Sequence, residues 1–269
     1  MGVRSIGLRT GMLGAGVWAM AATYASASPW GREPGSFFLS TRGDYFIARA
    51  DADDPMATGP IRFERYQTDN YAEVGVGWKT TIGAKAVYGT STFFDGFSVF
   101  SASGFSEIEA FAQREILHGD NHVLALRVAG AAPVRFSAGA RPGFISDGAD
   151  IDARVLYGRN LIAQPIKIFA TGEAGYRRRF GQGADQIRAD FLVGVEPSRR
   201  ILALVDLFST VSLGAAAPGG ADYDIIKVQP SLVWRATKRW SLQAGVTHEV
   251  WGRSVLLGDT YFLSLWTQF

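Results

Sequence analysis

The stretch YAEVGVGW (Tyr71–Trp78) decides the fold, because its even positions are apolar while its odd positions carry Glu or Gly. Segment Ile82–Tyr88 repeats this alternation after a short turn at Lys79–Thr81. Successive side chains of a β-strand point to opposite faces, so each segment has one apolar face and one small or charged face. The sequence therefore predicts two strands joined by a tight connection.

The same period recurs up to the C-terminus. Counting every such segment gives about twelve strands of roughly the ten residues that a tilted membrane strand requires. An even number suits a bacterial barrel. The further alternating segments are Phe37–Ala50, Glu107–Gln113, His122–Ala132, Ile151–Tyr157, Ile166–Arg177, Ile187–Val193, Ile201–Thr210, Ile226–Arg235, Leu242–Thr247 and Thr260–Phe269.

The composition narrows the class of protein. Of 269 residues, 47% are hydrophobic and 19% charged, the net charge is +2 and the mean hydropathy is +0.06. Such a chain is too hydrophobic to be disordered. Without Cys it has no disulfide scaffold, zinc-thiolate site or thiol nucleophile. Since no block of Lys and Arg is present, we expect no nucleic-acid partner.

The first residues predict export from the cytoplasm. Arg4 and Arg9 supply a positive region, Met12–Ala22 is apolar, and Ala25–Ala27 matches a small-x-small cleavage site. We expect residues 1–27 to be a signal peptide and residues 28–269 to form a single barrel domain. A membrane anchor is the alternative, but the apolar run falls short of the roughly 20 residues that span a bilayer.

The connections between the expected strands alternate between short and long, as the periplasmic turns and outer loops of outer-membrane barrels do. The short ones are Lys79–Thr81, His118–Asn121, Asn160–Gln164, Pro197–Arg200 and Ala236–Trp240. The longer ones are Asp51–Glu64, Thr92–Phe105, Pro133–Asp150, Arg178–Gln186, Gly214–Asp222 and Gly252–Asp259.

A periplasmic β-sandwich would also show alternating strands. Three features favour the barrel: charges on the non-apolar face of nearly every strand, aromatic residues at strand ends, and the terminal Phe269. The expected fold class is therefore all-β, a transmembrane antiparallel up-and-down β-barrel of about twelve strands with short periplasmic turns and longer outer loops.

The closing stretch YFLSLWTQF (Tyr261–Phe269) resembles the C-terminal signature of Gram-negative outer-membrane β-barrel proteins. A terminal aromatic residue follows hydrophobic residues at alternate positions, and Thr267 is the weaker match. The resemblance implies an outer-membrane location and recognition by the barrel-assembly machinery. The residues that would form this assembly signal are Tyr261, Leu263, Leu265 and Phe269.

A second resemblance is to XagA-like outer-membrane proteins, carried by YAEVGVGWKTTIGAKAVYG (Tyr71–Gly89) and the Glu107–Leu117 strand. Those proteins are associated with exopolysaccharide, adhesion and biofilm. The resemblance implies an accessory role in polysaccharide export or adhesion, with a plugged lumen and outer loops that bind.

The alternation also predicts which side chains face the lumen. A barrel of about eight strands is filled by side chains, whereas a porin of about sixteen strands encloses a water-filled channel. A barrel of about twelve strands lies between these sizes, so the sequence allows either a narrow passage or a plugged interior. A polar lumen suits passive passage of small polar or oligosaccharide-like solutes, whereas the alternative is a set of mutually paired charges that only hold the barrel together. The acidic and basic side chains expected in the lumen are about equal in number, which argues against strong ion selectivity. The expected lumen-lining residues are Glu73, Lys85, Glu107, Glu109, Arg127, Asp152, Arg154, Lys167, Glu173, Arg177, Arg188, Asp190, Lys227, Arg235 and Glu249, to which Asp206 is added by the same parity.

We expect no catalytic residues, no metal and no cofactor. A third function, a lipid-modifying enzyme, would use His248, which faces lipid beside Glu249 near the outer end of its strand. No suitable Ser pairs with it in the sequence, since Ser254 lies in the loop beyond. The run Arg177-Arg178-Arg179, at the outer end of a strand, is a candidate to bind outer-membrane lipids, in particular lipopolysaccharide phosphates, although a solvated rim is equally expected.

Overall fold

The computed structural model describes residues 28–50, 61–138, 145–146, 148–217 and 222–269. The expected signal peptide, residues 1–27, lies outside this part of the chain. The strands are β1 (Phe37–Ala50), β2 (Ile61–Gly77), β3 (Thr80–Phe94), β4 (Val99–His118), β5 (His122–Ala131), β6 (Val134–Ala138), β7 (Ile145–Ser146), β8 (Asp150–Ile162), β9 (Lys167–Arg179), β10 (Asp185–Ser198), β11 (Ile201–Leu213), β12 (Asp224–Arg235), β13 (Trp240–Arg253) and β14 (Gly258–Gln268).

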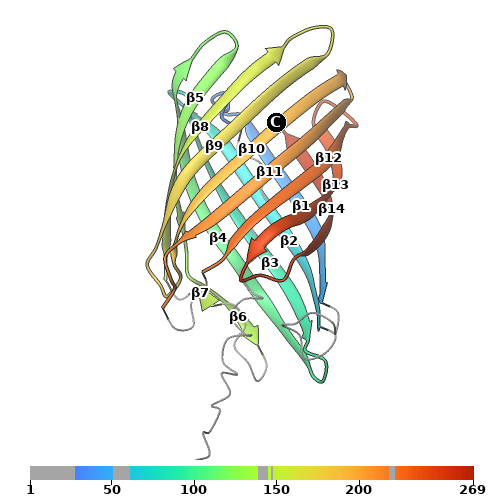
Figure 1. Ribbon diagram of the computed structural model, residues 1–269. Coiled ribbons are helices and arrows are strands. Elements are labelled where there is room, and N and C mark those ends of the chain that lie inside the picture. Colours follow the sequence, from blue (N-terminus) through green and yellow to red (C-terminus); the bar gives the residue numbers. More distant parts are fainter. Residues whose placement is uncertain (1–27, 51–60, 139–144, 147, 218–221) are drawn as a thin grey trace, which may run out of the picture.

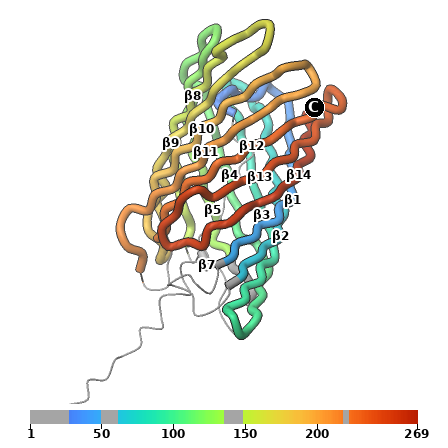
Figure 2. Tube along the Cα trace, turned by 45° about the vertical axis from the view of Figure 1, so that its right-hand side comes forward, coloured from blue at the N-terminus to red at the C-terminus, as the bar shows by residue number. Residues whose placement is uncertain are grey.

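Twelve of the described strands form one closed antiparallel barrel (Figures 1 and 2). Sequential strands pair with each other, and β1 pairs with β14 to close the ring. The chain leaves the wall after β5 to form β6 and β7, and the wall resumes with β8 beside β5. The prediction of an up-and-down barrel of about twelve strands is confirmed. Closure leaves no unpaired strand edge, which is the condition for spanning a bilayer with strands.

Short turns and the C-terminus lie at one end of the barrel, at the top of Figure 1, which we call the periplasmic end. The opposite, outer end carries the longer connections, with two exceptions, the four-residue connections β3–β4 and β13–β14. The expected loop Thr92–Phe105 is instead a tight turn, because β3 continues to Phe94 and β4 begins at Val99. Asp95 Oδ1 accepts hydrogen bonds from the backbone N–H groups of Phe97 (3.0 Å) and Ser98 (2.8 Å), which closes this turn.

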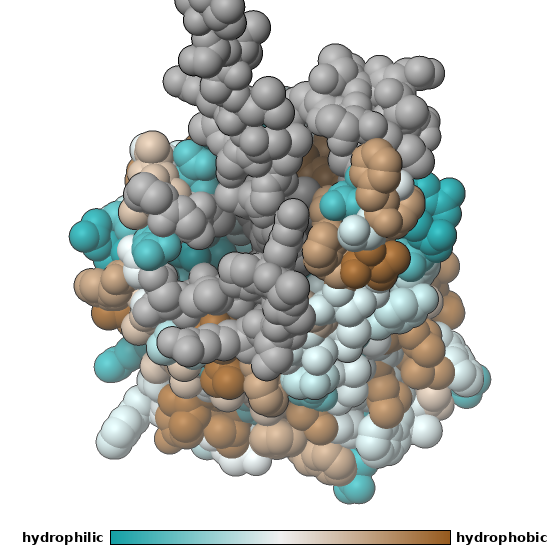
Figure 3. Space-filling model, turned by 90° about the horizontal axis from the view of Figure 1, so that it is seen from below, coloured by the Kyte–Doolittle hydropathy of each residue, from teal (hydrophilic) through white to brown (hydrophobic). Residues whose placement is uncertain are grey.

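Large apolar side chains cover the outside of the barrel. Leu232, Leu263 and Val128 are 60%, 59% and 56% exposed, far more than a water-soluble protein leaves in one contiguous surface. Seen from the outer end, apolar side chains lie around the periphery (Figure 3). Aromatic residues join this surface, as expected for the membrane interfaces: Trp78, Tyr88, Tyr157, Tyr176, Trp234, Trp240, Trp251 and Tyr261.

Two of the apolar clusters inside the barrel lie toward its ends, and two smaller ones are formed by Ala125 with Leu156 and by Tyr71, Phe111 and Ala129. The outer cluster contains Phe46, Ala48, Phe63 and Ile225, with Tyr223, Val255 and Leu256 packed against it. The periplasmic cluster contains Leu192, Leu202, Leu204 and Val233, with Phe169 and Trp266 beside it. Buried polar side chains occupy the region between the clusters. Within the described residues, no helix has the length and apolar character needed to cross a membrane.

Candidate functional site

The candidate site is the polar interior of the barrel. Each of the twelve barrel strands contributes at least one polar side chain that is less than 9% exposed, because alternate residues of every strand point inward. Eleven of the expected lumen residues belong to this buried set: Glu73, Lys85, Glu109, Arg127, Asp152, Arg154, Arg177, Arg188, Asp206, Lys227 and Glu249. The side chains of Glu107, Glu173 and Asp190 are 11–12% exposed and point into the same interior.

An ion-pair network covers the wall formed by β2–β5 and β8–β10. Arg177 lies at its centre, with 2.8 Å between its Nη2 and Glu109 Oε2 and 3.1 Å between its Nε and Asp152 Oδ2. Arg154 lies 2.7 Å from Asp152 and 3.2 Å from Asp190, and it also contacts Glu173. Charges on this wall therefore neutralise one another across neighbouring strands.

Lys85 and Arg127 continue the same network toward β3 and β5. Lys85 Nζ lies 2.8 Å from Glu107 and 3.4 Å from Asp69. Arg127 lies 3.8 Å from Glu109, and its guanidinium stacks 3.7 Å above the ring of Phe111. Burial of these charges is tolerated because each has an oppositely charged partner.

Amides and hydroxyls dominate the opposite wall, formed by β11–β14 and β1. Gln229 accepts hydrogen bonds from Arg42 (3.0 Å) and Thr247 (2.7 Å), and it donates to Asp206 (3.3 Å). Two further pairs extend this wall, Gln243 with Ser231 at 2.9 Å and Ser40 with Ser264 at 3.0 Å. Such groups can exchange their hydrogen bonds for those of water or a hydroxylated solute.

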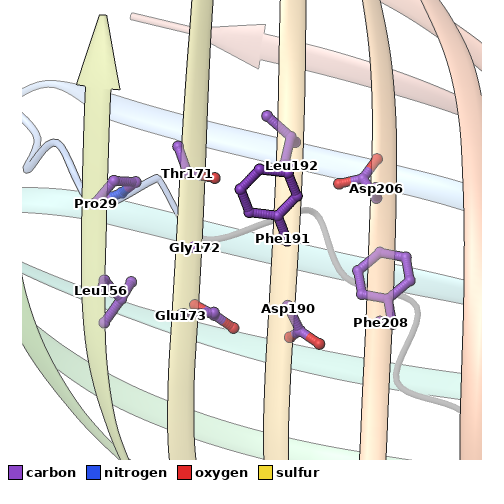
Figure 4. A pocket seen from close by; sticks show the side chains of 10 residues that line it. All are labelled: Pro29, Leu156, Thr171, Gly172, Glu173, Asp190, Phe191, Leu192, Asp206 and Phe208. Carbon is purple, nitrogen blue, oxygen red and sulfur yellow. The ribbon is translucent and has the colours of Figure 1, made fainter.

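A small pocket opens between the two walls, on β8–β11. Its lining includes the carboxylates of Glu173, Asp190 and Asp206, from three neighbouring strands, and Pro29 from the chain ahead of β1 (Figure 4). Leu156 and Phe208 supply apolar lining.

Two expected lumen residues lie at the periplasmic rim instead of the middle of the barrel. The side chains of Lys167 and Arg235 are 47% and 33% exposed, and both pair with Glu196, at 3.4 and 2.9 Å. Lys167 begins β9 and Arg235 ends β12, so parity alone could not tell a rim position from a mid-lumen one.

Several lumen residues escaped the sequence prediction. Arg42, Asp44, Arg65 and Asp69 are all less than 6% exposed on β1 and β2. The alternation is weak there because Phe46 and other aromatic residues also face inward. Arg42 pairs with Asp44 at 2.6 Å, and its guanidinium stacks 3.6 Å above the ring of Phe262.

The other candidate sites have local structural partners. Arg178 lies 2.6 Å from Asp185, and the backbone N–H of Arg179 donates to the same carboxylate at 2.9 Å. His248 Nδ1 lies 2.6 Å from Asp259 on the exposed outer face, without a serine or threonine partner among the described residues. Neither arrangement resembles a nucleophile with its base.

The C-terminal segment closes the barrel. Tyr261, Leu263 and Leu265 are 51%, 59% and 42% exposed on the lipid-facing side of β14. Phe269 exchanges two backbone hydrogen bonds with Phe37, at 3.0 and 2.9 Å, while its ring remains 60% exposed. The aromatic ring is therefore not needed to fill a core.

No family model matches the sequence, and no curated protein matches it. Solved structures share its fold. The COG4313 outer-membrane channel from Pseudomonas putida F1 is similar with a TM-score of 0.66 at 11% identity, over 91% of this chain and 100% of that one. This chain therefore has the fold of a transmembrane β-barrel. Its closed ring and apolar exterior place it in the outer membrane.

Two further structures agree with this fold. The translocator domain of the autotransporter NalP from Neisseria meningitidis gives a TM-score of 0.54 at 11% identity, over 88% of this chain and 90% of that one. The KdgM porin, solved in complex with disordered oligogalacturonate, gives 0.50 at 8% identity, over 86% and 99%. These neighbours include channels and a translocator, so the fold alone leaves the cargo open.

Proposed function

We propose that the protein is an outer-membrane channel for the passive passage of small polar or oligosaccharide-like solutes. The observation that carries the proposal is the polar interior, to which all twelve barrel strands contribute buried polar side chains. A barrel held together by packing alone has no need of amides, hydroxyls and charges along its whole inner wall. A solute pathway does, because a solute that leaves water needs replacement hydrogen bonds.

The amide and hydroxyl wall suits an uncharged hydroxylated solute. Gln229, Gln243 and Ser264 lie on adjacent strands. Gln243 and Ser264 hydrogen bond to the hydroxyls of Ser231 and Ser40, and Gln229 bonds to Thr247 as well as to the charged Arg42 and Asp206. The charged wall opposite carries both signs in close pairs, so it gives little net field along the path. Small neutral or zwitterionic polar solutes therefore fit this interior better than highly charged ones.

A second function is supported by the ion pairs and apolar clusters of the same interior. The ion pairs around Arg154 and Arg177, together with the apolar clusters at both ends, would suit a plugged barrel. In that case the protein would be an accessory to exopolysaccharide export, adhesion or biofilm formation, in line with the resemblance to XagA-like proteins. Its outer loops would then bind the polysaccharide.

Planar-bilayer recording of the purified protein tests the choice. A channel gives discrete current steps, and liposomes that contain it swell in small sugars. Replacing Gln229 and Gln243 with Leu should lower sugar flux, whereas replacing the lipid-facing Leu232 and Leu242 with Val should not. Absence of both current steps and swelling would reject the channel and favour the plugged accessory protein.

A further inference from the structure

The chain ahead of β1 lies inside the barrel. Residues Ser28–Pro34, which we call the strap, cross the periplasmic mouth and reach the inner surface of β8 and β9 (Figures 1 and 2). Pro29 is less than 2% exposed. The ring of Trp30 meets the ring of Phe169 edge-on, with 6.2 Å between the centroids.

Four polar contacts hold the strap to β2, β3 and β4. The backbone N–H groups of Gly31 and Arg32 donate to Glu115 Oε1 (2.6 Å) and Thr81 Oγ1 (2.8 Å). Arg32 Nε pairs with Glu73 Oε1 at 2.5 Å. Gln113 Nε2 donates to the carbonyl oxygen of Ser28 at 2.8 Å. The strap thus contacts two parts of the charged wall, β2–β4 through these polar contacts and β8–β9 through Pro29 and Trp30.

Two glycines of the wall make room for the strap. A Cβ atom on Gly75 would lie 2.1 Å from the carbonyl oxygen of Glu33. A Cβ atom on Gly158 would lie 2.6 Å from Pro29 Cγ and 2.8 Å from the Trp30 ring. Any larger residue at either position would collide with the strap, so the wall has the shape that this segment requires.

A hinge separates the strap from β1. Gly35 has φ of +80°, a conformation that side chains disfavour, and its N–H donates to the carbonyl oxygen of Gly75 at 2.8 Å. Gly75 N–H in turn donates to Ser36 at 3.0 Å. These bonds, together with the bridge between Pro34 and Gly75, fix residues 34–36 to the wall. Residues 28–32 contact side chains of the wall instead, so their release leaves the backbone bonds beside β1 in place.

We propose that the strap is a gate at the periplasmic mouth, and that its release widens the path and leaves Glu73 and Glu115 facing the mouth. The inference rests on the proposed channel function and adds its regulation. With Arg32 withdrawn, the two carboxylates lose the cation and the N–H group that face them. The open mouth is therefore more attractive to cations than the closed one.

Substitution of Gly158 tests release. Gly158→Val expels the strap by collision, so single-channel conductance rises and the reversal potential in a salt gradient shifts toward cation selectivity. Gly130→Val is the matched control, because a Cβ atom on the lipid-facing Gly130 meets nothing within 4 Å. It should conduct like the unmodified protein.

A disulfide tests closure, and the absence of native Cys makes the pair unambiguous. A Cβ atom on Gly31 would lie 3.5 Å from Glu115 Cγ, within reach of a disulfide between Gly31→Cys and Glu115→Cys. When Gly158→Val is added to this pair, oxidation should abolish the gain in conductance and reduction should restore it. Mass spectrometry of the oxidised cysteine-pair variant that keeps Gly158 shows whether the disulfide forms, without any measurement of current.

The outcomes separate the gate from the channel. Failure of the disulfide to form would show that the strap does not occupy the mouth, and would overturn the gate. If the protein conducts, but neither Gly158→Val nor the disulfide changes its current, the gate is overturned and the channel function is retained. If the disulfide forms and no variant conducts, the channel itself is rejected, and the gate with it.

Discussion

At the scale of single residues, Arg177 shows how the barrel tolerates so many buried charges. Its guanidinium contacts two carboxylates from β4 and β8 within 3.1 Å and is only 4% exposed. Arginine suits this position because its planar donors can serve several acceptors at once and it stays charged. Removing it would leave Glu109 and Asp152 buried with one partner fewer.

We therefore expect Arg177→Met to destabilise the barrel by about 3–5 kcal/mol, the usual cost of breaking a buried ion pair. Urea unfolding in lipid vesicles, followed by tryptophan fluorescence, measures the change. Arg62→Met is the control, because Arg62 pairs with Glu64 at an exposed position and its loss should leave the unfolding midpoint unchanged. Equal midpoints for both variants would contradict the role given to Arg177.

Asp185 has a more local role at the outer end of β9 and β10. Its carboxylate accepts hydrogen bonds from Tyr176 (2.5 Å), Arg178 (2.6 Å) and the backbone of Arg179 (2.9 Å). Asp185→Asn should loosen this hairpin, so proteases added to intact cells should cut near residues 180–184 faster than in the parent. Asp120→Asn, in an exposed turn at the other end, should leave the cleavage rate unchanged.

The same residue bears on the proposed contact of Arg178 and Arg179 with lipopolysaccharide. The side chain of Arg178 pairs with Asp185 and that of Arg179 with Asp150 (3.7 Å), so replacing both arginines with Glu removes two ion pairs and should loosen the hairpin. Unchanged sensitivity of cells to detergent and antibiotics, with faster proteolysis, would argue against the lipid contact. Increased sensitivity with unchanged proteolysis would support it.

Among the structural elements, the centres of the strands could be predicted from sequence and their ends could not. Alternation identifies β8 and β10 because charged and apolar residues alternate at every step between Ile151 and Val155 and between Ile187 and Phe191. The alternation does not identify a strand where it continues beyond the membrane. Near Asp95 both faces of β3 and β4 contact water, so polar and apolar residues no longer alternate there. The expected loop there is a continuation of the sheet.

The strap was also beyond prediction from sequence. Residues 28–34 have no period, and their position depends on contacts with β2, β4 and β8, which are far away in the sequence. The glycines of the inner face were visible as a pattern, but only the assembled wall shows that Gly75 and Gly158 face a second piece of chain.

The last strand offers a test of the assembly signal. Phe269 contributes backbone hydrogen bonds to the seam with β1, while its ring packs little. Phe269→Ala should therefore refold in detergent as the parent does, yet yield less folded barrel in cells, if the ring is read by the assembly machinery. Heat-modifiable mobility on gels measures both yields, and Phe269→Tyr should behave as the parent in each. Equal cellular yields for Ala and Tyr would remove the ring from the signal.

For the whole molecule, the apolar exterior determines where the protein can reside. Leu263 lies near the middle of β14 on the lipid-facing side and is 59% exposed. We expect Leu263→Arg to destabilise the barrel in bilayers by about 2–4 kcal/mol. Leu213→Arg, at the outer end of β11, should cost about 0–1 kcal/mol, because an arginine there reaches the interface. Refolding titrations in lipid vesicles give both values, and equal costs would contradict the assigned depth.

The alternation of inward polar and outward apolar residues also affects how the chain is exported. A continuous apolar run of about 20 residues would lodge in the inner membrane on the way out. In β8, for example, Asp152 and Arg154 interrupt the apolar residues at every second position. Each strand is thus too polar to remain in a bilayer by itself, and the surface that dissolves in lipid comes into existence only when neighbouring strands have joined. For this reason the same sequence can cross the inner membrane unfolded and then remain in the outer membrane as a folded barrel.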